Sequence, residues 1–233
     1  MTKHFSDPFL RVTEQHAAWG AEQLETFNEF MPLGEWSADL GQCLYRQAGR
    51  ELRISLLGTY DTSEQSWLWA WANPGFQGTP VVDAAEKVRQ YGQAHGLPEF
   101  THELIQLAAH DDPRRAAETL AFAAMGVLGA AGYLGVQASP DARAYMVPDD
   151  PQVPRAEPDA ITLPRVLLTG AGLLGGSARQ VVAGYFGHHD LPQRVATDRM
   201  SAGLPNGGTV DVLFDDADRI ASVSINSGEP ASA

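Results

Sequence analysis

Residues 52–74 read LRISLLGTYDTSEQSWLWAWANP and contain two apolar runs separated by a polar cluster. Apolar residues alternate with others from position 52 to position 56, which is the pattern of a strand with one buried face. The cluster DTSEQS at residues 61–66 is rich in turn-forming residues, and WLWAWAN at residues 67–73 predicts the strand that returns. The stretch therefore predicts an antiparallel β-hairpin.

Three tryptophans follow one another at alternate positions of the returning strand. Trp67, Trp69 and Trp71 would project from one face of that strand, about 7 Å apart. Core packing is the ordinary use of such large side chains, and a ligand cleft is the alternative. Tyr45, on another predicted strand, would add a hydroxyl to such a cleft, and Asn73, fixed by the proline that follows it, would add an amide. These five residues are the candidate ligand-binding set, and both interpretations stay open.

Helices and short strands are predicted on both sides of the hairpin. Asp7 can cap a first helix, Pro8 suits its first position, and Pro32 ends it. The pair Asp112-Pro113 is typical of another helix start. Helices are expected at residues 7–31, 82–93, 99–109 and 111–128. Strands are expected within residues 36–49 and in a closing hairpin at residues 132–147.

A proline-rich segment divides the chain into two parts. Prolines at positions 148, 151, 154, 158 and 164 disfavour helix and central strand, so they predict an extended linker. Beyond it we expect a helical segment and a three-stranded meander, with strands at residues 194–199, 209–214 and 219–225. The sequence thus predicts an α+β fold, in which an antiparallel sheet packs against helices and a smaller helix-plus-β-meander domain follows. The expected boundaries are a domain over residues 1–147, a linker over 148–160, a second domain over 161–226 and a flexible tail over 227–233.

The run GAGLLG at residues 170–175 has the glycine spacing of a dinucleotide-binding loop. That loop must follow a strand and open a helix inside a βαβ unit, and the chain beyond it predicts an antiparallel meander instead. We therefore expect a helix pair with a glycine-rich break, in which small residues allow close packing. A dinucleotide enzyme would require a parallel strand that ends near Gly170.

Other motifs fall short of a catalytic or metal-binding pattern. His102 has Gln106 where a zinc-protease helix needs its second histidine. Ser177 lacks the final glycine of a nucleophile elbow, and it is predicted to be a helix N-cap. The pair His188-His189 is predicted to lie in a solvated loop, and His16 is isolated in the sequence. We therefore assign no catalytic, cofactor-binding or metal-ligating residue.

Composition restricts the partners and the compartment. The formal net charge of −13 repels phosphate backbones, which argues against nucleic acid, and it suits a basic partner. Cys43 is the only cysteine, so an internal disulfide is excluded. The first residues lack the apolar core of a signal peptide, and no apolar run is long enough to span a bilayer. We expect a cytoplasmic protein without a membrane partner.

The stretch GTYDTSEQSWLWAWANP resembles the signature of an uncharacterised family of bacterial proteins. The similarity lies in a W-x-W-A-W-A-N strand at residues 67–73 and in the pair Tyr91-Gly92 of a following helix, and it covers roughly the first 150 residues. The later segment TVDVLFDDADRI is similar to one that commonly accompanies it, whereas the GAGLLGG run is not part of the resemblance. Because the family has no established activity, the resemblance implies a shared α+β fold and transfers no catalytic residue.

Three hypotheses for function remain. The first is a non-enzymatic binding or interaction protein whose acidic surface docks a basic partner. The second is a small-molecule-binding protein or enzyme with a pocket lined by tryptophan and tyrosine. The third, a dinucleotide enzyme, is the least favoured. No cofactor is expected, and whether the protein is an enzyme stays open.

Overall fold

The computed structural model describes residues 5–226, which form two compact units. Within this range the first unit comprises residues 5–9 and 23–155, and the second comprises residues 10–22 and 156–226. The division after residue 155 falls inside the segment predicted as a linker, and the predicted tail at residues 227–233 lies outside the described residues. Within the described residues, no helix is both long and apolar enough to cross a lipid bilayer.

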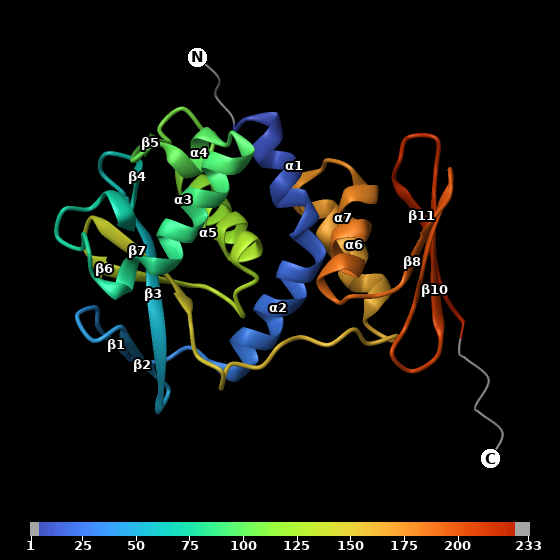
Figure 1. Cartoon of the computed structure of the whole chain (residues 1–233), viewed down its shortest axis with the longest axis horizontal. Helices are drawn as coiled ribbons and strands as arrows, with labels where there is room; N and C mark the ends of the chain where they lie inside the picture. Colours follow the sequence, from blue (N-terminus) through green and yellow to red (C-terminus); the bar gives the residue numbers. More distant parts are fainter. Residues whose placement is uncertain (1–4, 227–233) are drawn as a thin grey trace. The chain divides into compact units, whose positions relative to one another are not determined.

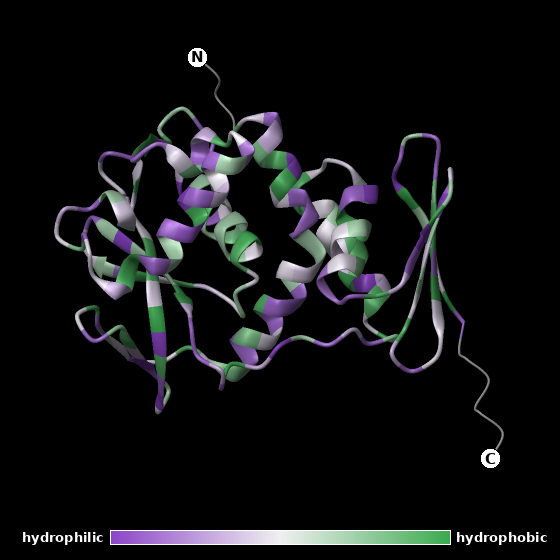
Figure 2. Cartoon of the chain, in the orientation of Figure 1, coloured by the Kyte–Doolittle hydropathy of each residue, from purple (hydrophilic) through white to green (hydrophobic). Residues whose placement is uncertain are grey.

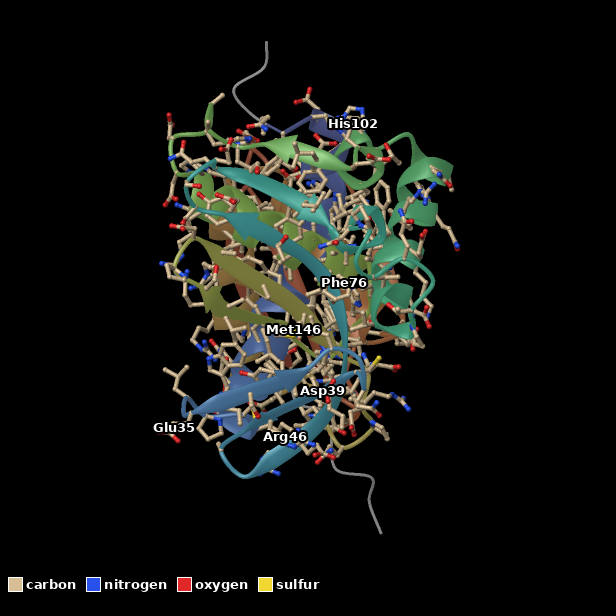
Figure 3. All side chains as sticks on the ribbon, turned by 90° about the vertical axis from the view of Figure 1, so that its left-hand side faces the viewer. Glu35, Asp39, Arg46, Phe76, His102 and Met146 are labelled. Atoms are coloured by element: carbon tan, nitrogen blue, oxygen red, sulfur yellow. The ribbon has the colours of Figure 1, made fainter. Side chains whose placement is uncertain are left out.

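The first unit is built around an antiparallel sheet, called the first sheet below. Its strands within the described residues are β1 (Trp36–Asp39), β2 (Leu44–Gln47), β3 (Arg50–Asp61), β4 (Ser66–Trp69), β5 (Leu104–Gln106), β6 (Leu134–Ser139) and β7 (Ala142–Pro148). They run in the order β1-β2-β3-β4-β5, while β7 also pairs with β3 and β6 pairs with β7. In Figure 3, Met146 lies within β7, and Asp39 and Arg46 mark the β1–β2 hairpin.

Helices cover this sheet. They are α3 (Asp83–His95), α4 (Pro98–Thr101) and α5 (Pro113–Leu128), with the short 3-10 helices η1 (Ala70–Ala72) and η2 (Pro80–Val82). Helices α3 and α5 pack against β3 and against each other (Figure 1). Asp112 caps α5 by accepting a hydrogen bond from the Arg115 N–H at 2.9 Å, as the sequence predicts. The mixture of helices and antiparallel strands confirms the predicted α+β class.

Strand β3 follows the predicted alternation where it enters the sheet. Leu52 and Ile54 are buried, while Arg53 between them is exposed. Figure 2 shows this alternation of hydrophobic and hydrophilic residues along β3. The buried face of α5 is rich in alanine, including Ala117 and Ala121, whose small side chains let the helix lie close to the sheet. The core of the first unit therefore lies between β3 and these helices.

The predicted hairpin is confirmed, but its returning strand is shorter than expected. Strands β3 and β4 pair antiparallel, with Tyr60 opposite Trp67 and Gly58 opposite Trp69. The ladder stops at Trp69, and the chain then turns into η1, so Trp71 does not lie on the strand face shared by the other two tryptophans. The expected row of three is wrong, because alternation in the sequence does not reveal where cross-strand pairing ends.

Residues 99–109 do not form the expected helix. Only the short helix α4 is present, and it is followed by β5, which pairs with β4 over Leu104–Gln106. Pairing with the free edge of β4 supplies hydrogen-bond partners for this backbone, which the local sequence pattern does not show. In contrast, the closing hairpin predicted at residues 132–147 is confirmed as β6 and β7.

The first predicted helix is divided into α1 (Asp7–Gln15) and α2 (Ala17–Phe30). The break lies at His16, whose N–H bonds the Thr13 carbonyl at 3.1 Å in a tighter 3-10 turn. The N–H of Gly20 bonds the His16 carbonyl, so a regular helix resumes after the break. Residues 10–22 of this helix pair belong to the second unit.

The second unit combines this segment with helices α6 (Leu163–Leu174) and α7 (Ala178–His188) and a second sheet. The strands of that sheet, within the described residues, are β8 (Gln193–Val195), β9 (Arg199–Gly203), β10 (Thr209–Phe214) and β11 (Ile220–Asn226), in the order β11-β10-β9-β8. All pairs are antiparallel. Within the described residues the second sheet thus holds four strands where three are predicted, because a turn after Val195 separates β8 from β9.

The glycine-rich run forms part of a helix and not a loop after a strand. Gly170 and Gly172 lie inside α6, which starts at Leu163 and follows extended and turn residues. A Cβ at Gly170 would lie 2.5 Å from the Cα of Ala18, and one at Gly184 in α7 would overlap the carbonyl oxygen of Gln15. The predicted helix pair is therefore confirmed, and its glycines allow residues 10–22 to approach closely.

Ser177 begins α7, as the sequence predicts. Its hydroxyl oxygen accepts a hydrogen bond from the Gln180 N–H at 3.4 Å. The buried carboxylate of Glu14 accepts a bond from the Ser177 N–H at 3.3 Å, and a Cβ at Gly176 would overlap this carboxylate. The positive end of α7 is thus already occupied by an acidic side chain of the same unit.

Two alanine substitutions in α6 test this packing. Gly170→Ala should lower the free energy of unfolding by about 2 kcal/mol, because the new methyl group meets the backbone of Ala18. Gly172→Ala is the matched control: nothing lies within 4 Å of its Cβ, so better helix propensity should leave stability equal or raise it by about 0.5 kcal/mol. Chemical denaturation followed by circular dichroism measures both, and equal effects would contradict the packing.

Candidate functional site

The three predicted tryptophans are buried in the first unit. Trp67 and Trp69 are fully inaccessible, and their rings meet edge to face with centroids 5.2 Å apart. The Trp69 Nε1–H donates to the carbonyl of Glu99 at 2.9 Å. Trp71 is 7% exposed, and the guanidinium of Arg89 lies 4.5 Å from its ring centroid. These contacts are those of packed core residues, and a ligand-binding role for the tryptophans stays a prediction.

The other two predicted site residues lie apart from the tryptophan pair. Tyr45 is fully buried on β2, donates to Oε1 of Gln47 at 2.5 Å, and stacks on Trp36. Burial raises the pKa of Tyr45 to about 12. The side chain of Asn73 accepts a hydrogen bond from the Gly75 N–H at 2.9 Å, which fixes the turn after η1. The structure therefore brings Trp67 and Trp69 together but does not gather all five residues.

A cleft of about 830 Å³ opens at a different place in the first unit. Residues of β3 and β7 form one wall, η2 and the start of α3 form the second, and the end of α5 with the segment after β7 completes it. The lining residues are Cys43, Arg53, Ile54, Ser55, Pro80, Asp83, Ala84, Lys87, Leu128, Gly129, Ala130, Ala131, Val147, Pro148, Asp149, Asp150, Pro151, Val153 and Arg155. None of the five predicted residues is among them.

The cleft contains charges of both signs, and most of them already have partners. The Arg53 Nε–H donates to the carbonyl of Asp149 at 2.7 Å, and its guanidinium lies 3.3 Å from the carboxylate of the same residue. The backbone N–H of Arg53 donates to Asp150 and holds the pKa of that carboxyl below its usual value. Arg155 donates to the carbonyl of Gly129 at 2.6 Å, at the end of α5.

Two potential nucleophiles line the cleft, and neither is activated. Burial, followed by the negative charge of Asp83, raises the pKa of the Cys43 thiol, so the reactive thiolate is disfavoured. The Ser55 hydroxyl donates to the Val81 carbonyl at 3.0 Å and accepts from the Ala84 N–H at 3.3 Å, which makes it a structural group. The geometry therefore suits binding better than covalent catalysis.

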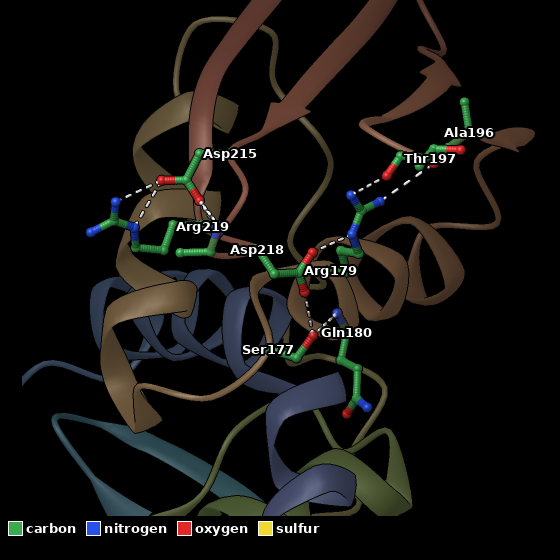
Figure 4. Close-up of polar contacts among 9 residues, drawn as sticks. Ser177, Arg179, Gln180, Ala196, Thr197, Asp215, Asp218 and Arg219 are labelled. Atoms are coloured by element: carbon green, nitrogen blue, oxygen red, sulfur yellow. Dashed lines mark hydrogen bonds and ion pairs between the residues drawn. The ribbon is translucent and has the colours of Figure 1, made fainter.

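The second unit holds a separate polar network around Arg179 of α7 (Figure 4). The guanidinium bonds the Asp218 carboxylate and the carbonyls of Ala196 and Thr197, and it lies 4.3 Å from the Phe214 ring centroid. These contacts tie α7 to the β8–β9 turn and to the β10–β11 turn. Because the donors are directed at groups of the fold, we interpret the network as structural.

His189 does not lie in the solvated loop that the sequence predicts. Its side chain is 6% exposed, and Nε2 lies 3.0 Å from Oε2 of Glu22, which is also buried. Tyr185 donates to the other oxygen of Glu22 at 3.0 Å. The prediction is wrong because α7 continues to His188 and faces residues 10–22, a segment far away in the sequence.

His16, isolated in the sequence, is paired with a second histidine in space. Its Nδ1 lies 2.7 Å from Nε2 of His188, and the His188 ring stacks on Trp19 with centroids 3.9 Å apart. Burial, assisted by His188, lowers the pKa of His16 to about 3, so its imidazole is neutral at physiological pH. Within the described residues, no group of three or more histidine, cysteine or acidic side chains is arranged to hold a metal ion.

One family model matches this chain, with a description that assigns no activity. The model is that of DUF6882, a family of unknown function, and the match covers residues 10–151. The chain belongs to this family. The predicted membership of an uncharacterised family is thereby confirmed, and no curated protein or solved structure matches the chain. The DUF6882 match includes the first sheet and the cleft except Val153 and Arg155, whereas α6, α7 and the second sheet lie beyond it.

Local sequence patterns contain little indication of this cleft. Its charged residues come from four separate stretches, around Arg53, Asp83, residues 149–150 and Arg155, and none of these stretches forms a known motif. The one local signal is the proline-rich segment, whose pattern predicts a linker. In the structure this segment runs beside β3, where the Asp149 N–H bonds the Arg53 carbonyl at 2.9 Å.

Thiol reactivity tests the placement of Cys43 beside Asp83. Asp83→Asn should lower the pKa of the thiol and raise the rate of alkylation by iodoacetamide near neutral pH by about twofold, since one repulsive charge is removed. Asp111→Asn removes an exposed carboxylate outside the cleft and should leave the rate unchanged. Equal rates for wild type and Asp83→Asn would show that the two side chains are not neighbours.

The buried His16 predicts a pH dependence of stability. Its pKa in the folded state lies below the ordinary histidine value of 6.5, so the unfolded chain binds the extra proton first as the pH falls. The free energy of unfolding should therefore decrease from about pH 6.5 downward, toward about pH 3. Denaturant unfolding between about pH 7 and about pH 5 measures the slope, which His16→Leu should reduce. A variant with the wild-type slope would contradict this assignment.

Proposed function

We propose that the first unit is a non-enzymatic binding module that takes a small molecule into the cleft beside β3 and α3. The observation that carries this proposal is the cleft of about 830 Å³, a volume within the usual range of small-molecule sites. Apolar residues with accessible surface, such as Pro80 and Leu128, line it together with charged groups. Such a combination provides burial for the body of a ligand and polar contacts that fix its orientation.

The chemistry of the lining supports binding over catalysis. The Ser55 hydroxyl is held by the backbone of η2 and α3, and the Cys43 thiol is kept protonated by burial and by Asp83. A reacting site would need a nucleophile with an adjacent base and an orienting group. The net charge of −13 supports a basic protein partner as a separate proposal, for which we assign no surface.

A substitution that fills the cleft tests the proposal. The purified protein is incubated with a small-molecule extract of its host and examined by native mass spectrometry at low activation energy. Wild type should retain a small mass, and Ala84→Phe should lose it, because Ala84 lines the cleft. Ala94→Phe places the same side chain at an exposed position of α3 away from the cleft, and it should retain the mass.

Circular dichroism shows whether Ala84→Phe keeps the fold. The proposal fails if folded Ala84→Phe retains the small molecule as well as wild type does, or if wild type retains none.

A further inference from the structure

The balance of charge in the cleft indicates what kind of ligand it accepts. Three basic residues, Arg53, Lys87 and Arg155, face three acidic ones, Asp83, Asp149 and Asp150. A cleft with no net formal charge does not favour a polyanion such as a nucleotide. It fits a ligand that is neutral overall.

The lining also restricts the shape of the ligand. Among the residues that the structure describes, the lining contains no aromatic side chain, so a planar base or a sugar ring would find no stacking platform. Among the apolar lining residues, Pro80 is exposed and Leu128 and Ala130 are half-buried, so each keeps surface that a ligand can cover. They provide contacts for an aliphatic body.

Two of the six charged side chains that line the cleft have no bonding partner within the described residues. The side chains of Asp83 and Lys87 have no hydrogen bond or ion pair with any residue in the described part of the chain, and they do not pair with each other. The other four charged residues have partners. Arg53 bonds Asp149 and Asp150 in the segment after β7, and Arg155 bonds the Gly129 carbonyl at the end of α5. The free positive and negative groups therefore lie on one wall of the cleft.

Helix geometry sets the separation of these two groups. Asp83 and Lys87 are four residues apart on α3, so they share one face with their Cβ atoms about 5–6 Å apart. An ammonium and a carboxylate carried by one tetrahedral carbon can contact both side chains at once. The carboxyl end of α5 lines the same cleft at Leu128–Ala131, but Arg155 already bonds the Gly129 carbonyl there, so Asp83 is the group that remains for an ammonium.

We infer that the ligand is a small zwitterion of the α-amino acid class with an aliphatic body. Its ammonium group binds Asp83, its carboxylate binds Lys87, and its side chain lies against Pro80 and Leu128. This inference rests on the proposed function, because it names the ligand class of the same cleft.

Probes that each lack one charge test the inference. Isothermal titration calorimetry is performed with the standard L-amino acids, with their amides, which lack the carboxylate, and with their N-acetyl derivatives, which lack the ammonium. An amino acid with an aliphatic side chain should bind most tightly, and its amide and N-acetyl forms should bind about tenfold more weakly.

Charge variants assign each end of the ligand. Asp83→Asn should weaken amino acid binding about tenfold while the N-acetyl form is unaffected, and Lys87→Met should weaken amino acid binding while the amide is unaffected. Asp111→Asn and Arg115→Met remove one exposed charge of each sign outside the cleft and should change neither affinity.

The outcomes separate the two proposals. If an amide or an N-acetyl form binds as tightly as the free amino acid, or if no amino acid binds, the zwitterion inference is overturned. Retention of a host molecule by wild type and its loss in Ala84→Phe would still support the cleft in that case. If retention is also absent, the binding function fails together with the inference.

Discussion

The close approach of residues 10–22 to α6 and α7 is the constraint on which the second unit depends. Gly170 and Gly184 supply the space, since a methyl group at either position would meet the backbone of Ala18 or Gln15. The approach also buries Glu22 against Tyr185 and His189. Their side chains give the buried carboxylate polar partners, without which its burial would be costly. Because this segment lies between two pieces of the first unit in the sequence, neither unit is one continuous stretch of chain.

The two units differ in how many polar side chains remain without a partner and can therefore bind a ligand. In the second unit, Arg179 and Asp218 bond each other and neighbouring carbonyls, and Glu14 occupies the start of α7. These groups hold helices to turns and have little capacity left for a ligand. In the cleft of the first unit, Asp83 and Lys87 keep their full bonding capacity, which is why we place binding there.

The bounds of the DUF6882 match differ from the bounds of the two compact units. The family match includes residues 10–22, which pack in the second unit, but it stops before the glycines of α6 and α7 that accommodate them. It also covers the first sheet and most of the cleft. The packing of residues 10–22 therefore depends on helices beyond the family match, whereas the candidate site lies almost wholly inside it.

The sequence by itself determined the α+β class, the β3–β4 hairpin, the Asp112 and Ser177 helix caps and the helical nature of the glycine-rich run. Each follows from contacts between residues close together in the chain, such as alternation, turn chemistry or capping. Only the tertiary structure decided that β4 ends before Trp71, that residues after α4 form β5, and that His16 meets His188. The cleft belongs to the same group, because Arg53, Asp83 and Asp149 become neighbours only when distant segments pack. Local sequence patterns carry no information about such long-range packing.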